Sequence, residues 1–162
     1  MTTAEKVVSL LIGQGKRIAF AESCTGGLVA ATLVDVPDAS RVLDMSFVTY
    51  ANEAKISLVD VSADTLAALG AVSEQTAREM AEGVCRRSGA DVGVSVTGIA
   101  GPGGGTPEKP VGTVCFGFCL NGDTSTCTCH FEGLDRRGVR EASVAFVFRT
   151  LSVLLQKKEQ IG

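Results

Sequence analysis

The spacing of hydrophobic residues along the chain predicts an alternation of helices and strands. Apolar positions three and four residues apart indicate amphipathic helices, whereas short continuous apolar runs indicate buried strands. These patterns predict helices over about residues 4–14, 26–34, 52–58, 62–69, 73–87 and 136–157, strands over about 16–21, 42–50 and 91–96, and a two-stranded hairpin within 111–131. We therefore expect an α/β fold, a three-layer α/β/α sandwich around a mixed, roughly five-stranded sheet.

Composition narrows the class of protein. The chain has 162 residues, of which 45% are apolar and 20% charged, and its net charge is −3. These values are typical of one globular domain, here residues 1–162, and give no overall field that attracts nucleic acid. No apolar run approaches the roughly 20 residues of a membrane helix, and no signal peptide is visible at the N-terminus. We therefore expect a soluble cytoplasmic domain that binds neither nucleic acid nor membranes.

Six cysteines raise the question of a disulfide or metal cluster. Four of them lie in the predicted hairpin, and Asn121-Gly122 is a strong signal for a two-residue turn between its strands. In that register Cys119 lies opposite Thr124 and Cys127 opposite Phe116, so the two cysteine pairs point to opposite faces of the sheet. A loop one residue longer would bring all four to one face. We expect small buried hydrophobic side chains rather than a cluster.

The first candidate site segment is the hydroxyl-rich turn that follows the first predicted strand. Ser23 lies between an apolar run ending at Ala21 and a helical pattern beginning at Leu28. Ligands of open α/β sheets bind at this edge, where free N–H groups and the helix dipole favour negative charge. The alternative is that Ser23 and Thr25 only cap the helix.

Two more polar segments also follow predicted strands. The loop from Thr97 to Thr106 is rich in glycine, which allows backbone N–H groups to approach an anion closely. It is neither a dinucleotide fingerprint nor a Walker loop, and the alternative is a flexible surface loop. The segment from Thr49 to Lys55 supplies Tyr50 and Lys55. The alternative is an ordinary surface lysine at a helix start.

The sequence contains few candidate bases for a serine nucleophile. The only histidine, His130, lies within the predicted hairpin, far along the chain from any strand-end turn. If Ser23 is a nucleophile, its base is therefore expected to be Lys55, with a pKa lowered by burial, or Tyr50. Arg136 and Arg140 share one face of the last helix and suit a phosphate or a carboxylate. The alternative for both is a solvated helix face.

These segments together carry a family resemblance. They are Ala21–Gly27, Thr49–Lys55, Gly70–Glu74 and Val96–Gly105, followed by Lys109–Val114. In this order they resemble the CinA C-terminal domain, of the competence/damage-inducible family, whose enzymatic members are nicotinamide-nucleotide amidases (PncC type). The resemblance covers about residues 5 to 155, and the chain resembles the stand-alone form of this domain.

The sequence departs from the family pattern at two places. In Gly133-Leu134-Asp135-Arg136 the arginine stands one residue out of step with the family's Gly-Asp-Arg. This difference could change the position of the Arg136 side chain relative to the site. Asp44-Met45-Ser46-Phe47 replaces a Gly-Gly-like stretch ahead of the second strand and bears on the approach to Tyr50.

The resemblance implies hydrolysis of the carboxamide of nicotinamide mononucleotide to nicotinate mononucleotide and ammonia. Ser23 would be the nucleophile, Lys55 with Tyr50 the base, and N–H groups near Thr25 and Gly26, or near Thr97 and Gly98, would hold the oxyanion. The substrate's phosphate would bind to the loop with Gly101, Gly104 and Gly105 and to Arg136 or Arg140. No metal and no cofactor is expected, the partner is a small-molecule substrate, and the resemblance suggests a homo-oligomer, with a dimer as the first expectation.

Two other classes of function stay open at this point. One is a nucleotide-binding or partner-docking module of the same family without turnover, and a buried Lys55 within hydrogen-bond reach of Ser23 would favour the enzyme over it. The other is a cysteine redox protein that uses Cys24 at the helix N-terminus, although the chain contains no Cys-x-x-Cys partner for it.

Overall fold

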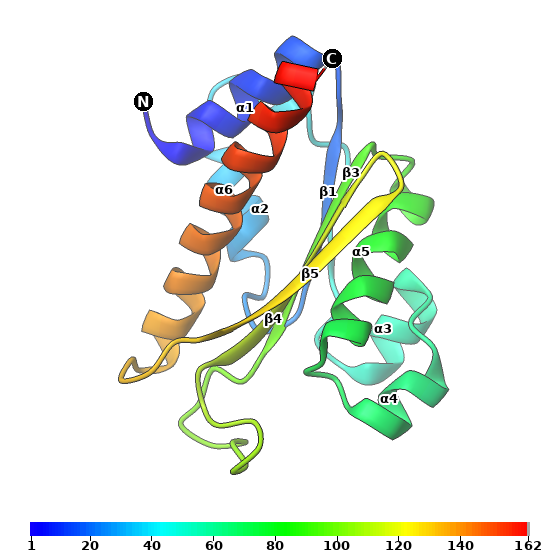
Figure 1. The fold of residues 1–162 in the computed structure, drawn as a ribbon, viewed down its shortest axis with the longest axis vertical. Helices are drawn as coiled ribbons and strands as arrows, with labels where there is room; N and C mark the ends of the chain where they lie inside the picture. The colour runs from blue at the N-terminus through cyan, green and yellow to red at the C-terminus, as the bar shows by residue number, and fades with distance from the viewer. Residues whose placement is uncertain (162) are drawn as a thin grey trace.

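The computed structural model describes residues 1–161, with side chains through Glu159, and contains one five-stranded sheet between two helical layers (Figure 1). Its elements in chain order are α1 (Thr3–Gln14), β1 (Ile18–Glu22), α2 (Leu28–Val34), the 3-10 turn η1 (Ala39–Arg41), β2 (Phe47–Val48), α3 (Asn52–Val59), α4 (Ala63–Leu69), α5 (Glu74–Ser88), β3 (Val92–Gly98), β4 (Thr113–Leu120), β5 (Asp123–His130) and α6 (Arg136–Ile161). Helices α1, α2 and α6 pack on one face, and α3, α4 and α5 on the other. The predicted α/β/α sandwich is confirmed.

The sheet is mixed, with the strand order β2-β1-β3-β4-β5. Strand β1 runs parallel to β2 and β3, whereas β4 is antiparallel to β3 and β5 is antiparallel to β4. The strand predicted over 91–96 is therefore the middle strand. The carboxyl ends of β1, β2 and β3 meet at one edge of the sheet, where the three polar segments begin.

The hairpin has the predicted register. Asn121 and Gly122 both adopt positive φ, at 51° and 88°, as a two-residue type I′ turn requires. Cys119 accordingly lies opposite Thr124, and Cys127 lies opposite Phe116. The two cysteine pairs therefore point to opposite faces of the sheet.

The strand predicted over 42–50 is much shorter in the structure, where β2 has only two residues. Two polar side chains ahead of it explain the difference. The hydroxyl of Ser46 accepts the N–H of Phe20 at 3.1 Å, which takes a main-chain donor of β1 away from a strand partner. The carboxylate of Asp44 pairs with Arg17. Hydrogen bonds of this kind compete with a strand ladder.

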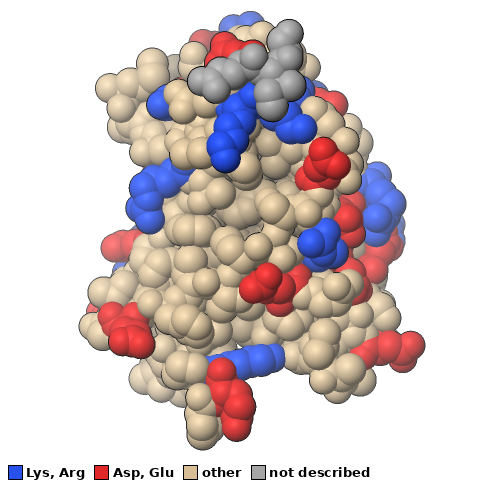
Figure 2. All heavy atoms as spheres, viewed as in Figure 1, with Lys and Arg blue, Asp and Glu red and all other residues tan. Residues whose placement is uncertain are grey.

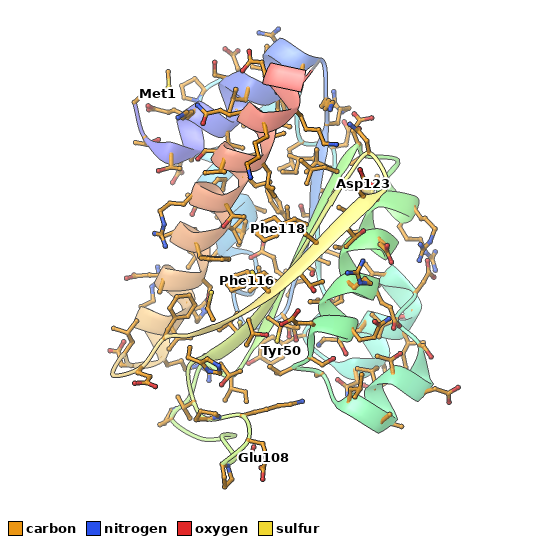
Figure 3. All side chains as sticks on the ribbon, in the orientation of Figure 1. Met1, Tyr50, Glu108, Phe116, Phe118 and Asp123 are labelled. Atoms are coloured by element: carbon orange, nitrogen blue, oxygen red, sulfur yellow. The ribbon has the colours of Figure 1, made fainter. Side chains whose placement is uncertain are left out.

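The larger core fills the space between the sheet and α1, α2 and α6. Phe20, Phe116, Phe118 and Phe148 are buried in it, and Figure 3 shows Phe116 and Phe118 pointing from β4 into this layer. On the other face the strands carry small residues. A Cβ on Gly117 would lie 2.4 Å from the carbonyl oxygen of Ala77, so α5 packs against the sheet at backbone distance.

Helix α3 is held against α5 by a similarly close contact. A Cβ on Gly83 would lie 1.7 Å from the carbonyl oxygen of Val59, which no side chain could tolerate. This contact fixes α3, and with it Lys55, over the carboxyl end of the sheet. Serines cap the neighbouring helices, since Ser62 accepts the N–H of Asp64 and Ser73 accepts that of Thr76. Among the described residues we find no helix with the length and apolar character of a membrane span.

Candidate active site

A small cavity opens at the carboxyl ends of the parallel strands. It has a volume of about 280 Å³ and is formed by the turn after β1, the start of α3, the segment before α5, the loop after β3 and the first turn of α6. Its lining residues are Ser23, Cys24, Tyr50, Lys55, Ala71, Val72, Thr97, Gly98, Ile99, Ala100, Gly101, Gly103, Gly104 and Arg136. All three polar segments predicted from the sequence therefore contribute to one cavity.

Ser23 is held in place by main-chain and side-chain contacts on both sides. Its N–H donates to the carbonyl of Val96 in β3 at 2.9 Å, so the residue continues the sheet. The preceding residue, Glu22, is 1% exposed, and its carboxylate accepts the N–H groups of Val29 and Ala30 at 2.9 and 3.0 Å. A carboxylate at the start of α2 suits the helix dipole. The turn that presents Ser23 is thereby fixed between β1 and α2.

Lys55 is buried, with 1% of its surface exposed, and its ammonium nitrogen points at Ser23. Nζ lies 3.2 Å from Ser23 Oγ, 2.9 Å from the carbonyl oxygen of Thr49 and 3.1 Å from that of Tyr50. Burial lowers the pKa of Lys55 below its ordinary value, and the nearby Cys24 opposes that shift. A neutral amine has two N–H groups and one lone pair. The two carbonyls match the N–H groups, which leaves the lone pair for the hydroxyl of Ser23.

Tyr50 reaches Lys55 through its main chain rather than its ring. Its side chain is 58% exposed, and its hydroxyl accepts a hydrogen bond from Arg136 Nη2 at 2.9 Å. Figure 3 shows Tyr50 at the same end of the molecule as the loop that carries Glu108. A part for the Tyr50 hydroxyl in taking the serine proton stays a prediction, without a contact to Ser23 or Lys55 in the described structure.

The loop after β3 lines the cavity with residues whose main-chain N–H groups are free. Gly101 and Gly104 have φ values of 84° and 89°, a conformation that glycine adopts without strain. The N–H groups of Ala100, Gly101, Gly103 and Gly104 make no hydrogen bond to any residue the structure describes. Free N–H groups of successive residues can form an anion-binding concavity, and here Pro102 separates two such pairs.

The two arginines at the start of α6 have different positions. Arg136 lines the cavity and donates to the carbonyl of Gly101 at 2.7 Å and to the hydroxyl of Tyr50. Arg140 lies behind the turn after β1 and donates to the carbonyls of Cys24 and Thr25 at 3.0 and 3.1 Å. Arg136 therefore reaches the site despite the altered sequence before it. Both line a second cleft of about 680 Å³ that shares Ala100 and Arg136 with the first.

Comparison with known proteins gives the family. The CinA C-terminal domain family matches residues 1–155. The chain belongs to this family. A putative competence-damage inducible protein of Clostridium novyi is 51% identical over 144 residues, covering 89% of this chain and 34% of that protein. One of Symbiobacterium thermophilum is 54% identical over 149 residues, covering 86% of this chain and 35% of that protein. The chain thus spans about a third of the length of these curated relatives.

Solved structures of CinA proteins have the same fold over nearly their whole length. A competence-damaged protein (CinA) superfamily protein from Klebsiella pneumoniae matches with a TM-score of 0.91 and 38% identity, over 97% of this chain and 99% of that one. A competence/damage inducible protein from Agrobacterium tumefaciens matches with a TM-score of 0.88 and 40% identity, over 96% and 97%. The CinA fold predicted from the sequence motifs is therefore confirmed.

The structure separates the predicted site residues of this CinA domain into two groups. The residues that line the cavity are Ser23, Tyr50, Lys55, Thr97, Gly98, Gly101, Gly104 and Arg136. Those that do not line it are Thr25, Gly26, Gly105 and Arg140. Thr25 is fully buried, Gly26 lies beside Arg140, and a Cβ on Gly105 would meet the N atom of Val111 at 2.8 Å. These positions support the site from outside the cavity.

Thr97 lines the cavity, but its hydroxyl is already engaged. It donates to the carbonyl of Ala71 at 2.8 Å, which ties the end of β3 to the segment before α5. Ala71 and Val72 are cavity residues that the sequence reasoning did not single out as site residues. Their signal was their place in the segment before Ser73, one of the motifs that carry the family resemblance.

Cys24 also lines the cavity, beside Ser23. Burial raises the pKa of its thiol from 9.0 to about 11, although Arg140 acts in the opposite direction. The thiol is therefore protonated at neutral pH and is a poor nucleophile. This observation favours the hydroxyl of Ser23 over a cysteine redox centre.

Proposed function

We propose that this CinA domain hydrolyses the carboxamide of nicotinamide mononucleotide to nicotinate mononucleotide and ammonia. The observation that carries the proposal is the buried contact between Lys55 Nζ and Ser23 Oγ. A lysine with a lowered pKa next to a serine hydroxyl is a recurring way to activate a nucleophile. A module that only binds nucleotides has no need to bury an amine against a hydroxyl.

The reaction proceeds by acyl transfer to Ser23. The neutral amine of Lys55 takes the hydroxyl proton while Ser23 Oγ attacks the amide carbon, which gives a tetrahedral oxyanion. When the C–N bond breaks, Lys55 returns the proton to the leaving ammonia. Water then attacks the ester on Ser23, with Lys55 again as the base, and releases the carboxylic acid.

The turn after β1 offers a donor to the oxyanion. Of the N–H groups first considered there, that of Gly26 donates to the carbonyl of Ser23 and is not available. The N–H of Cys24 has no protein partner among the described residues, and Cys24 lines the cavity. Loss of one such donor commonly lowers the rate by about 10²–10³. By holding the carbonyl of Cys24, Arg140 keeps this turn in a fixed orientation.

The free N–H groups of the loop from Ala100 to Gly104 and the guanidinium of Arg136 are the proposed phosphate contacts. All of these loop residues except Pro102 line the cavity, and Arg136 lines both this cavity and the larger neighbouring cleft. A cavity of about 280 Å³ suits the pyridine ring and leaves the ribose phosphate to reach toward Arg136. The reaction also fits the cytoplasmic location expected from the sequence.

The test is release of ammonia from nicotinamide mononucleotide by the purified chain and by Ser23→Ala. We expect turnover by the unchanged chain and none above background in Ser23→Ala, which should still bind the nucleotide. Full activity of Ser23→Ala would refute the nucleophile. Tight binding without turnover by the unchanged chain would instead support a binding module.

A further inference from the structure

The loop that joins β3 to β4, residues 99–112, forms one wall of the candidate active site and extends beyond the sheet. Figure 1 shows it below the carboxyl end of β3, and Figure 2 shows basic surface where it adjoins the neighbouring helical layer. Its outer part, residues 102–109, contains three glycines and two prolines. Because glycine loses more conformational freedom on ordering than any other residue, this stretch needs contacts that hold it in one conformation.

One side chain ties the outer part of the loop to the rest of the protein. Lys109 Nζ donates to the carbonyl oxygen of Leu69, the last residue of α4, at 2.7 Å. In the described part of the chain this is the only hydrogen bond that joins residues 102–109 to a residue outside that stretch. The Leu69 carbonyl lies in the last turn of its helix, where carbonyls lack a partner within the helix. A lysine at that end also suits the helix dipole.

The main chain of Lys109 is itself fixed by a tight turn. Its N–H donates to Thr106 Oγ1 at 3.0 Å, and the N–H of Thr106 donates to the carbonyl oxygen of Lys109 at 2.9 Å. The side chain of Lys109 is half-buried. The amine therefore reaches Leu69 from a main chain that is already held in place.

The acceptor of this hydrogen bond belongs to the opposite wall of the cavity. Leu69 leads directly into Ala71 and Val72, which line the cavity. The carbonyl of Ala71 accepts the hydroxyl of Thr97 at 2.8 Å. The segment before α5 is thus joined to the end of β3 by Thr97 and to the outer part of the loop by Lys109.

We propose that Lys109 is a positioning residue that holds the phosphate-binding part of the loop in place before the substrate binds. The inference rests on the proposed function, which assigns the free N–H groups of Gly103 and Gly104 to the substrate's phosphate. Without the contact to Leu69, the substrate has to order the loop as it binds, and that cost lowers its affinity. Lys109 does not line the cavity, so the chemical step at Ser23 should change little when it is replaced.

The first test is the mobility of the loop, measured as NMR order parameters of the main-chain N–H groups of Gly103 and Gly104. Lys109→Met keeps an unbranched side chain and removes the amine. The order parameters should fall below about 0.6, the range of flexible backbone, while those of β3 stay near about 0.85. Equal values for the loop in the unchanged chain and in Lys109→Met would overturn the proposal.

Two further variants act as controls for this measurement. Lys109→Arg keeps a cation that can donate to the Leu69 carbonyl, so it should restore the order of the loop. Glu108→Gln changes the neighbouring exposed residue, which Figure 3 shows at the outer end of the loop, and should leave the order parameters unchanged. A loop that becomes equally mobile in Glu108→Gln would remove the special part of Lys109.

The second test separates binding from chemistry. In Lys109→Met, KM for nicotinamide mononucleotide should rise about three- to tenfold, as expected for one lost hydrogen bond, with kcat changed by less than about twofold. Lys109→Arg should return KM to its original value. A fall in kcat with KM unchanged would overturn the proposal. So would a raised KM without any change in the loop order parameters, because Lys109 would then act by its charge alone.

Inorganic phosphate gives a test that needs no turnover. Titrated against the N–H signals of Gly103 and Gly104, it should bind more weakly to Lys109→Met than to the unchanged chain and to Lys109→Arg. Equal phosphate affinities would overturn the proposal. Absence of amidase turnover in the unchanged chain would refute the proposed function alone, because the order parameters and the phosphate affinities still decide the part of Lys109.

Discussion

Replacement of Lys55 by methionine tests the proposed base most directly. The substitution keeps an unbranched chain of similar length and removes the nitrogen that lies 3.2 Å from Ser23 Oγ. General base catalysis contributes about 10²–10⁴ in rate. Because Lys55 is 1% exposed, bulk water cannot readily replace it. We therefore expect kcat to fall by about 10⁴, at the upper end of that range, with KM changed only a few-fold.

The pH dependence of kcat/KM gives a second test of Lys55 as the base. Only the neutral amine accepts the serine proton, and burial lowers the pKa of Lys55 from its ordinary value. Below that lowered pKa the neutral fraction falls tenfold for each pH unit, so kcat/KM should rise with pH and then level off. The residual rate of Lys55→Met should lack this slope. The difference between the two proteins therefore shrinks as the pH is lowered.

The lowered pKa of Lys55 also makes the free energy of unfolding depend on pH, in a direction that can be stated. A lysine whose pKa is lower in the folded chain than in the unfolded chain binds fewer protons when folded. Between the folded pKa and the unfolded value of about 10.4, the free energy of unfolding therefore rises with pH. Below the pKa that Lys55 has in the folded chain, the lysine is charged in both states, and burial of that charge lowers the free energy of unfolding by its full amount. Chemical denaturation across this range should show the rise in the unchanged chain and not in Lys55→Met.

Ammonia release and nucleotide binding, measured between about pH 6 and pH 10, provide the assay. Lys157→Met, at an exposed lysine near the C-terminus, is the matched control and should behave like the unchanged chain. Lys55→Arg should be nearly inactive although it keeps the charge, because arginine does not deprotonate in this range. Near-normal turnover by Lys55→Arg, or the same pH slope in Lys55→Met, would refute the serine–lysine mechanism.

Three further predictions concern the surroundings of this pair. Glu22→Gln replaces a buried carboxylate that accepts two main-chain N–H groups, so the free energy of unfolding should fall by about 2 kcal/mol; an unchanged urea midpoint would contradict this. Gly101→Ala places a Cβ 2.4 Å from Val111 Cγ1 at a φ of 84°, so KM should rise, whereas Gly103→Ala meets nothing within 4 Å and should not change it. Cys24→Ser should keep its rate within a few-fold, and a loss of turnover would assign the thiol a part in the reaction.

Those parts of the fold that local chemistry determines could be predicted from the sequence. Asn121-Gly122 fixed the hairpin register because both residues adopt positive φ, and Ser73 marked the start of α5 because its hydroxyl accepts the N–H of Thr76. The length of β2 could not be predicted. It depends on Ser46 bonding to Phe20, a contact between residues 26 apart that no local hydrophobic pattern contains.

The candidate site likewise has features that could be predicted from the sequence and features that could not. Ser23 and Lys55 were predictable because each follows a strand that ends at the same edge of a parallel sheet. The different positions of Arg136 and Arg140 could not be predicted, because both residues lie on one helix face. Arg140 meets the carbonyl of Thr25, a residue 115 positions earlier, and only the packing of α6 against α2 decides which arginine reaches the cavity.

The position of Glu22 is compatible with the proposed role of Lys55 as a base. A carboxylate in contact with a lysine raises its pKa and keeps it protonated, and Glu22 is the residue next to Ser23. Its two oxygens instead accept the N–H groups of Val29 and Ala30, and no salt bridge to Lys55 is present among the described side chains. The N–H groups at the start of α2 thus hold the Glu22 carboxylate, and it makes no ion pair with the Lys55 side chain. The lysine is left with carbonyl partners that accept from an amine as well as from an ammonium.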